Sequence, residues 1–416
     1  MGFTSSTAVR DTRFGSSVGG AVDANSIRAR LHEDLDRLRS ADGYLRAGAP
    51  RYATLFGRDS LISAWQSLSF DPSIAAATLR ILATFQGRTV NMKSEEQPGK
   101  ILHEHRFDPG SRAELPDWDF PYYGSVDSTL LFLIVASEYA HKKDDTQLVT
   151  DLWPTLVAAH HWIGAYGDID GDGFVEYERK NPHGLFHQGW KDGSENHLGI
   201  EPPVAMVEVQ GYAHAAHRAF ASLAEAVGDA EVAGSAQAAA DRLRRRLNED
   251  FWMEDRGFFG LALDGRKRMR RAVTSNPGHL LLCGAVEPRR VPAVVGRLFQ
   301  DDLWTPYGVR THASSEPDFD PMSYHRGTVW PHDNWFLYRG LLAANRQAEA
   351  HRIREALLRA YGELGKIPEL YAVVDDKLVD LSAPTSNAKV MANALQAWAT
   401  AGLLDMISED DPEVSL

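Results

Sequence analysis

Apolar residues recur about every 3.6 positions along most of the chain, which is the spacing of one face of an α-helix. Connections rich in Gly, Pro and Asp separate these segments, and the alternating pattern typical of strands is rare and short. The spacing predicts helices over 24–40, 59–69, 73–86, 125–141, 146–166, 204–226, 230–248, 275–284, 288–299, 329–345, 347–363 and 386–403. We therefore expect a chain that is mostly α-helical.

The predicted helices are of two kinds. Segment 232–248 has an apolar face and a charged run at 241–246, which is typical of a helix that covers a core and faces water. Segments 128–136 and 277–284 are apolar nearly throughout, as expected of helices buried on all sides. We predict an inner ring of helices inside an outer ring. Two separate helical domains are the alternative, but no linker between them is visible.

Many of the Trp, Asp, Glu, His and Arg residues lie in four long connections, 87–123, 167–203, 300–328 and 364–385. Loops of this length inside a compact domain usually carry function, so we expect the chemistry at the end of the rings where they lie. The Ser/Gly/Thr-rich residues 1–22 are expected to form a flexible leader, and the acidic residues 409–416 a tail. Residues 23–408 are then one catalytic domain.

Charge and cysteine content narrow the classes of partner. The net charge is −13, with 44 Lys and Arg against 57 Asp and Glu, so a nucleic acid would meet a repulsive field. Cys283 is the only cysteine, which excludes an intrachain disulfide and a cysteine-based zinc site. No signal-peptide core and no run of about 18 apolar residues is present. We expect a cytoplasmic protein that binds neither nucleic acid nor membrane.

Stretch 51–59 places Arg58 and Asp59 at the predicted start of a helix, where an acidic residue suits the first turn. The pair is either a local helix cap or a binder of sugar hydroxyls, because a carboxylate accepts hydroxyl protons and a guanidinium donates in a fixed fork. On its own the stretch favours the cap.

Stretches 99–106 and 117–127 are rich in charged and aromatic residues, namely Lys100, His103, Glu104, His105, Arg106, Trp118, Tyr122, Tyr123 and Asp127. Two histidines that flank a glutamate could suggest zinc, but no third ligand stands at a known spacing. Aromatic rings beside carboxylates and arginine are typical of a carbohydrate site, since rings cover the C–H face of a sugar while polar groups bind its hydroxyls. A buried aromatic cluster is the alternative.

Two carboxylates stand out as candidate catalytic groups. Stretch 188–197 crowds Trp190, Lys191 and Asp192 into a glycine-bounded loop that apolar periodicity does not explain. Glu369 lies between a proline and a leucine, an apolar and rigid setting that raises the pKa of a carboxyl or demands a partner. A solvated loop and a paired structural glutamate are the respective alternatives.

Stretch 322–335 concentrates polar and aromatic residues, among them Tyr324, Arg326, Trp330 and His332. A local Ser-His-Asp triad is conceivable, but no G-x-S-x-G elbow and no α/β pattern accompanies it, so we exclude a serine hydrolase. Dinucleotide and P-loop nucleotide sites lack support as well, because their glycine-rich motifs are absent.

An acidic loop with Asp168, Asp170, Asp172 and Glu176 opens like a calcium-binding EF-hand loop. The glutamate that completes an EF-hand would fall at Arg179, so a complete EF-hand is excluded. A smaller calcium site with oxygen ligands and an empty acidic turn remain equally open.

Nine ordered motifs resemble the bacterial amylo-α-1,6-glucosidase (glycogen debranching) family: LFGRDSLISAW, PGKILHEHR, YYGSVDSTLLFL, GDGFVEY, QGWKDG, VEVQGY, SNPGHLL, SYHRGTVWPHDN and IPELY. They are similar, more distantly, to glycoside hydrolase family 63, which includes α-glucosidases and hydrolases of mannosylglycerate and glucosylglycerate. The resemblance spans about residues 45–403, and nine motifs in one order are far more specific than any single motif.

That resemblance implies an all-α (α/α)6 toroid and an inverting mechanism with two carboxylates. It places the general acid at Asp192, in the GWKD motif, and the general base at Glu369, in the PEL motif. By the same matching, Arg58 and Asp59 would hold the sugar hydroxyls. The pocket would be lined by Trp190, Lys191, Gln210, Trp330 and His332, and from the stretches above we add His103, Glu104, Tyr123, Asp127, Tyr324 and Arg326. No cofactor is required, and a structural calcium ion at the acidic loop is possible.

Debranching members of the family carry an N-terminal β-rich domain that this sequence lacks, so we expect small substrates. Our interpretation is an exo-acting, inverting α-glucosidase for small α-glucosides or short α-glucans. The same resemblance leaves two alternatives among the hydrolases: a glucosylglycerate or mannosylglycerate hydrolase, and an α-1,6-glucosidase that acts on glycogen-type branches. A sugar 2-epimerase, an unsaturated-uronyl hydrolase and a non-catalytic sugar-binding toroid are further alternatives, because fold alone does not separate them. The oligomeric state stays open.

Overall fold

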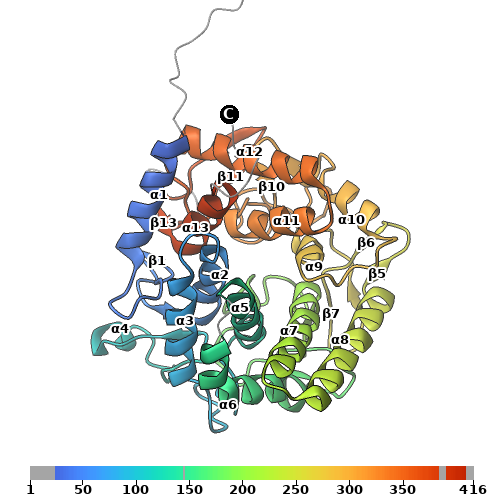
Figure 1. The fold of residues 1–416 in the computed structure, drawn as a ribbon. Coiled ribbons are helices and arrows are strands. Elements are labelled where there is room, and N and C mark those ends of the chain that lie inside the picture. The colour runs from blue at the N-terminus through green and yellow to red at the C-terminus, as the bar shows by residue number, and fades with distance from the viewer. Residues whose placement is uncertain (1–23, 144–145, 384–389, 409–416) are drawn as a thin grey trace, which may run out of the picture.

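The computed structural model describes residues 24–143, 146–383 and 390–408, and helices dominate this part of the chain. Six of them form an inner ring at the centre of Figure 1: α2 (Gly57–Ser67), α5 (Ser128–Lys143), α7 (Val207–Ala226), α9 (His279–Leu282), α11 (Pro331–Ala343) and α13 (Ala397–Met406). Six more surround it within the same described residues: α1 (Ala24–Leu38), α3 (Pro72–Thr84), α6 (Thr146–Trp162), α8 (Ala230–Asp250), α10 (Val291–Leu298) and α12 (Gln347–Leu364). The expected (α/α)6 toroid is therefore confirmed.

Outer and inner helices alternate along the chain, and each inner helix packs against its two neighbours in the ring. The inner helices other than α9 also pack directly on outer helices, while the outer helix α10 packs on η2, the turn that precedes α9. The circle closes where α1, the first outer helix, packs on α13, the last inner one. Arg28 on α1 adds a polar contact there, because its Nε donates to the carbonyl of Ile407 at 2.6 Å.

Burial separates the two rings as the apolar pattern predicts. Nearly every residue of α2 is buried, and so is the segment of α5 from Ser128 to Ser137. Helix α8 buries only a stripe of small and aliphatic side chains, while its charged run faces water. The predicted apolar segment 277–284 begins as a 3-10 turn, η2 (Asn276–Gly278), and continues as α9 in the inner ring.

The helices of the two rings begin in different ways. Asp71 before α3 and Asp229 before α8 accept hydrogen bonds from first-turn N–H groups, which are ordinary side-chain caps. The inner helices α2, α7, α11 and α13 instead follow residues in extended conformation and have no side-chain cap. Their first turns are therefore free to carry functional side chains.

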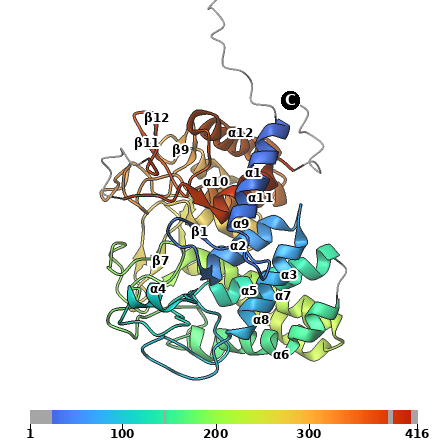
Figure 2. The same cartoon turned by 90° about the vertical axis from the view of Figure 1, so that its left-hand side faces the viewer.

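The strands are short and all antiparallel among the described residues, as the sequence predicts. They pair as β1 (Gly48–Ala49) with β13 (Leu395–Gln396), β2 (Leu55–Phe56) with β3 (Glu104–His105), β5 (Trp252–Met253) with β6 (Phe258–Phe259), β9 (Trp304–Thr305) with β10 (Gly308–Val309), β11 (Ala372–Val374) with β12 (Lys377–Val379), and β4 (Ala205–Met206) with β7 (Ala262–Leu263) and β8 (Met269–Arg270). Figure 2 shows many of these pairs and the long connections at one end of the toroid, on its left-hand side.

The helix predicted over 386–403 is wrong in its first part. Residues 386–389 lie outside the described residues, 390–396 are not helical, and α13 begins only at Ala397. Backbone groups that an extension of α13 would use are bonded elsewhere, because Asn393 exchanges hydrogen bonds with Glu369 and the next residues pair with β1. The other predicted helices are found within a few residues of their expected bounds.

Two further elements complete the described chain: a short helix, α4 (Pro109–Ala113), and a π-helical turn at the end of α6, η1 (Ile163–Gly167). The predicted leader 1–22 and acidic tail 409–416 lie outside the described residues. No helix in the described ranges is long and apolar enough to cross a membrane.

Close packing within the inner ring gives a stability prediction. A Cβ at Gly340 of α11 would lie 2.8 Å from the Cβ of Leu281 and 2.8 Å from the backbone N of Leu282. We expect Gly340→Ala to lower the free energy of unfolding by about 1–3 kcal/mol in denaturant titrations, since α9 must move to admit the methyl group.

Gly234→Ala in α8 is the matched control. A Cβ there meets no atom within 4 Å, so the substitution should stabilise the protein by roughly 0.5–1 kcal/mol through helix propensity alone. Equal effects of the two substitutions would contradict a tightly packed inner ring.

Candidate active site

A pocket of about 280 Å³ lies where the long connections meet the first turns of the inner helices. Its lining combines Arg58 and Asp59 from the start of α2, Trp330 from the start of α11 and Trp398 from the start of α13 with residues of the connections. Asp192 and Glu369 both line it, although they are far apart in the sequence.

Arg58 lies beneath the pocket and is 1% exposed. Its Nε donates to Asp127 Oδ2 at 3.0 Å, and its Nη1 donates to Asp192 Oδ2 at 2.8 Å. Ser125 Oγ donates to the other oxygen of Asp127 at 2.7 Å, so this carboxylate is held on both sides. A buried guanidinium with two fixed carboxylate partners orients Asp192 toward the pocket.

Glu369 is 3% exposed and is held by its backbone and by its carboxylate. Its N–H donates to the carbonyl of Asn393 at 2.9 Å, and the N–H of Asn393 donates to Glu369 Oε2 at 2.8 Å. The hydroxyl of Tyr324 donates to Oε1. Asn393 lies in segment 390–396, which was predicted to be helical, and this segment therefore positions the Glu369 carboxylate.

The pKa values of the two carboxyls lie close together. Burial raises the pKa of Asp192 to about 6, although the Arg58 guanidinium opposes the shift. Burial raises the pKa of Glu369 to about 7, opposed by the hydrogen bonds from Tyr324 and Asn393. Asp192 has the lower pKa of the two, because it has a cationic partner and no cation contacts Glu369 among the described residues.

Asp59 is a third carboxyl at the pocket. Burial raises its pKa to about 8, even though Arg58 opposes the shift, so it is mostly protonated at neutral pH. Gln396 Nε2 donates to its Oδ1 at 3.2 Å. Asp59 can thus donate a hydrogen bond to a ligand oxygen as well as accept one.

Aromatic rings form much of the remaining wall. Trp330 lies edge-on to Trp190, with 5.7 Å between ring centroids, and edge-on to Tyr324 at 4.8 Å. Trp118 stacks on Tyr122 at 3.8 Å and contributes its ring from the connection 87–123. Such rings beside carboxyls suit a sugar ring, whose C–H face is apolar and whose hydroxyls are polar.

The structure brings together most of the residues that the sequence singles out for a pocket. The lining contains Arg58, Asp59, His103, Glu104, Trp190, Asp192, Tyr324, Trp330 and Glu369.

Six residues expected to bind substrate do not line the pocket: Tyr123, Asp127, Lys191, Gln210, Arg326 and His332. Asp127 lies behind Arg58 as its ion-pair partner. Gln210 is fully buried and its amide binds the backbone N–H and carbonyl of Val175 at 2.8 and 2.7 Å. These two side chains support the site and do not face it.

The other four also bind parts of the protein itself. Tyr123 donates its hydroxyl to the carbonyl of Phe85 at 2.7 Å, and Lys191 Nζ donates to the carbonyl of Thr311 at 2.7 Å. His332 stacks against the ring of Trp398, with 3.9 Å between the centroids. The carbonyl of Arg326 accepts the N–H of Asp320 at 2.9 Å, within the turn that precedes the Trp330 segment. The motifs that contain these residues belong to the site, but the side chains of Tyr123, Lys191 and His332 and the backbone of Arg326 contact its frame.

Seven lining residues are absent from the expected set: Tyr52, Phe56, Arg106, Leu115, Trp118, Leu185 and Trp398. Arg106 and Trp118 belong to stretches 99–106 and 117–127, whose composition is typical of a carbohydrate site. The sequence therefore did carry a signal for these two residues. Tyr52 carries no such signal. Its backbone is left-handed, with a φ of 62°, and this conformation is not readable from the sequence around it.

The acidic loop differs from an open calcium site. Lys267 Nζ lies 2.8 Å from Asp170 Oδ2 and 2.8 Å from Asp172 Oδ2, and it also donates to Glu176. Oxygens of Asp168, Asp170 and Glu176 lie within 4.8 Å of one another, which is a spacing that could hold a metal ion. An ammonium group already lies among these carboxylates, and a calcium ion would compete with it for the same oxygens.

Comparison with known proteins identifies the family. Residues 52–375 match the sequence model of the mannosylglycerate hydrolase MGH1-like glycoside hydrolase domain. A mannosylglycerate hydrolase of Rubrobacter radiotolerans is 29% identical over 199 residues, which are 47% of this chain. The match covers 41% of that relative, less than half of its length.

Solved structures share the fold. A family 63 mannosylglycerate hydrolase from Thermus thermophilus in complex with Tris has a TM-score of 0.67 and 16% identity over 92% of this chain and 99% of that chain. A family 78 rhamnosidase of Bacillus sp. GL1 has a TM-score of 0.62 and 18% identity over 92% of this chain and 34% of that chain. At these identities the likeness shows the glycosidase toroid and no more.

The paired carboxyls predict a pH profile. If Asp192 acts as the general acid and Glu369 as the general base, as the resemblance implies, kcat/KM should be bell-shaped with limbs near pH 6 and pH 7, because the active form has Asp192 protonated and Glu369 ionised. Tyr324→Phe removes a hydrogen bond that lowers the pKa of Glu369, so this pKa rises. Since Glu369 has the higher pKa of the pair, the upper limb should move to higher pH and the maximum should fall.

Tyr307→Phe is the control, because that hydroxyl donates to Glu363 and lies outside the pocket lining. It should leave both limbs in place. An unmoved upper limb in Tyr324→Phe would show that this hydroxyl does not set the acidity of Glu369.

The acidic loop predicts the response to chelators. We expect the melting temperature of the natural protein to be unchanged by EDTA, since the Lys267 ammonium already binds the oxygens that a calcium ion would use. Lys267→Met should lower the melting temperature in EDTA, and calcium should restore it by binding only the folded state. Lys366→Met, which breaks an ion pair with Asp380 alone, should show no calcium response. A melting temperature of the natural protein that falls in EDTA would mean that calcium binds despite Lys267.

Proposed function

The chain belongs to the family of mannosylglycerate hydrolase MGH1-like glycoside hydrolase domains, and from this premise we propose that it removes one hexosyl unit from small α-hexosides. As a member of this family it is a glycoside hydrolase. In the proposed reaction Asp192 is the general acid and Glu369 the general base of a single displacement with inversion.

One observation carries the proposal: Asp192 and Glu369 share one pocket while each is held by a different part of the fold. Protonated Asp192 would give its proton to the leaving glycosidic oxygen. Ionised Glu369 would take a proton from the water that attacks the anomeric carbon from the opposite face. Burial raises both pKa values toward neutrality, which suits groups that exchange protons near pH 7.

Neighbouring groups support binding of a sugar at this point. Arg58 fixes the Asp192 carboxylate, and the protonated Asp59 offers a donor to a ring hydroxyl. The rings of Trp190 and Trp330 provide apolar faces for the sugar. These contacts would align the anomeric carbon between the two carboxyls.

The size of the pocket favours small substrates. A volume of about 280 Å³ suits one hexosyl unit, so remote units of a polymer would contribute little binding energy at the reacting bond. Trimming of glycogen-type branches, to which the motifs also bear a resemblance, is the weaker candidate for this reason.

A hexosylglycerate is the substrate class that one further observation favours. The pocket continues at Tyr52 and Arg106 into a hollow of about 570 Å³ that Arg51 also lines. Arg51 donates to the carbonyl of Met391 at 3.2 Å and has no ion-pair partner among the described residues. Its guanidinium suits the carboxylate of an aglycone such as glycerate. The relatives from Rubrobacter radiotolerans and Thermus thermophilus are named mannosylglycerate hydrolases, which agrees with this class.

The test compares four substrates at equal concentrations of hexosyl ends: α-glucosylglycerate, α-mannosylglycerate, the uncharged α-glucosylglycerol and glycogen. We expect kcat/KM to be highest for a glycerate and lowest for glycogen. The first sugar released should be the β-anomer by NMR, as inversion requires. Arg51→Gln should reduce the preference for glucosylglycerate over glucosylglycerol by about tenfold, the effect of losing one charge-assisted contact.

Two substitutions serve as controls for the chemistry. Asp192→Asn and Glu369→Gln should each lower kcat by about 10²- to 10⁴-fold without loss of the folded state by circular dichroism. Near-normal turnover in either variant, or α-glucose as the first product, would refute the assigned roles. Efficient trimming of glycogen would return the protein to the debranching class.

A further inference from the structure

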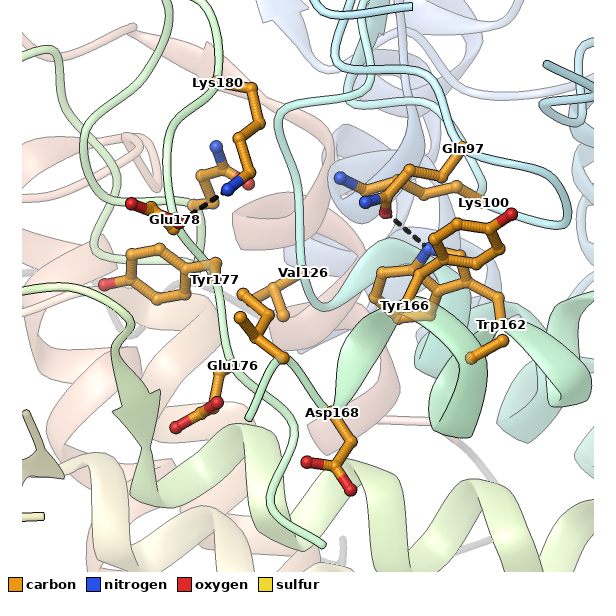
Figure 3. Close-up of a pocket in the computed structure, with 13 residues that line it drawn as sticks. Gln97, Lys100, Val126, Trp162, Tyr166, Asp168, Glu176, Tyr177, Glu178 and Lys180 are labelled. Atoms are coloured by element: carbon orange, nitrogen blue, oxygen red, sulfur yellow. Dashed lines mark hydrogen bonds and ion pairs between the residues drawn. The ribbon is translucent and has the colours of Figure 1, made fainter. Parts of the chain in front are cut away.

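A second cavity, of about 210 Å³, lies apart from the active-site pocket and shares none of its described lining residues. Figure 3 shows it, with Gln97, Lys100 and Trp162 on one side and Glu178 and Lys180 on the other. Segment 185–192 separates the two spaces, because Gln188 lines this cavity while Leu185 and Trp190 line the active-site pocket. Neither the proposed reaction nor its substrate uses the cavity.

Lys100 is the unusual group in this cavity. It is 5% exposed, and none of the described residues forms an ion pair with its Nζ or accepts a hydrogen bond from it. Its one recorded contact is with the ring of Trp162, whose centroid lies 5.7 Å from Nζ. The oxygens of the nearby Glu95 are bonded to Gln188, Asn181 and Tyr122 instead. A buried ammonium without an acceptor costs free energy, and burial accordingly lowers the pKa of Lys100 to about 8.

Two amides add unused hydrogen-bonding groups to the lining. Gln97 accepts the N–H of Trp162 at 2.8 Å, and its own Nε2 has no acceptor within the described chain. Gln188 donates its Nε2 to Glu95 at 2.5 Å, and its Oε1 has no donor there. Side by side, Lys100 and these amides offer two donors and one acceptor to a molecule in the cavity.

Each carboxylate of the lining already has a partner, although Glu176 Oε2 is buried without one. Glu178 forms an ion pair of 2.5 Å with Lys180, Glu176 binds Lys267, and Asp168 accepts the N–H groups of two glycines at 2.8 and 2.9 Å. A small anion at Lys100 would still lie among three carboxylates and be repelled by them. A neutral ligand whose hydroxyls both donate and accept suits this mixture of groups, and the rings of Trp162 and Tyr166 suit its C–H face.

We propose that this cavity, around Lys100, is a second and non-catalytic binding site for a neutral monosaccharide or polyol. Ile169, which lines the cavity, is 40% exposed, so the cavity reaches the surface at this residue.

A short series of hydrogen bonds and ion pairs connects this cavity to Asp192. The carbonyl of Gln188 accepts the N–H of Val126 at 2.9 Å. The next residue after Val126 is Asp127, whose carboxylate binds Arg58, and Arg58 binds Asp192. A ligand that holds Gln188 in place therefore stabilises the arrangement around Asp192.

The experiment is calorimetric titration with D-glucose of the natural protein and of three variants. The natural protein should bind two equivalents. Lys100→Met should bind one, with affinity at the second cavity lowered roughly tenfold or more by loss of the charged donor, while its turnover without added sugar is kept. Trp330→Ala, which removes a ring of the active-site pocket, should also bind one equivalent, this time at the Lys100 cavity. Lys93→Met is the matched control, since this exposed lysine pairs with Asp119 and lines neither space.

Thermal unfolding without sugar gives a second readout. Lys100→Met should melt no lower than the natural protein, because methionine fills a similar volume without a buried unpaired charge. Two results would overturn the proposal. The first is that the natural protein and Lys100→Met both bind one equivalent of glucose, and the second is that Lys100→Met melts at a clearly lower temperature than the natural protein. Binding of inorganic phosphate in place of glucose at this cavity would overturn it as well. If the active-site assignment alone fails, Trp330→Ala matches the natural protein while Lys100→Met still loses its equivalent.

Discussion

The buried guanidinium of Arg58 joins the inner ring of helices to the loop that carries Asp192. It lies in the first turn of α2 and pairs with Asp127, just before α5, and with Asp192 in the connection 167–203. A buried charge is tolerated only when its partners are in place, so this one group ties two neighbouring helices to one catalytic position. Three of the four uncapped inner helices, α2, α11 and α13, begin at the pocket, which Arg58, Trp330 and Trp398 line.

The second carboxylate of the pocket, Glu369, is held by hydrogen bonds and not by an ion pair. Among the described residues no cation contacts Glu369, and the backbone N–H of Asn393 and the hydroxyl of Tyr324 support its charge. Asp192 is thus stabilised as an anion by a permanent charge, whereas Glu369 depends on dipoles that a bound ligand can rearrange. This difference accounts for the lower pKa of Asp192, about 6 against about 7 for Glu369, although burial raises both.

Local periodicity was sufficient to predict the rings, because helices of the inner ring are apolar all round and those of the outer ring are not. It failed at 390–396, where hydrogen bonds to a glutamate more than twenty residues away override an apolar helical spacing. The motifs predicted that Asp192, Glu369 and the aromatic walls beside them lie together, but not which way each side chain points, so Gln210 and Lys191 proved to bind the backbone. The sequence does not reveal that Lys267 lies among the acidic residues of the loop, because this contact joins segments nearly a hundred positions apart.

The closure of the circle, with α1 packed on α13, has a consequence for how the molecule acquires activity. Trp398 reaches the pocket from α13, and the residues just before that helix hold Glu369. The pairing of β1 with β13 brings both ends of the described chain to the segment that holds Glu369, so the proposed base is positioned only where the circle is closed. A chain truncated before Asn393 would keep both partners of the ion pair between Arg58 and Asp192 in its sequence and lose the backbone group that holds Glu369.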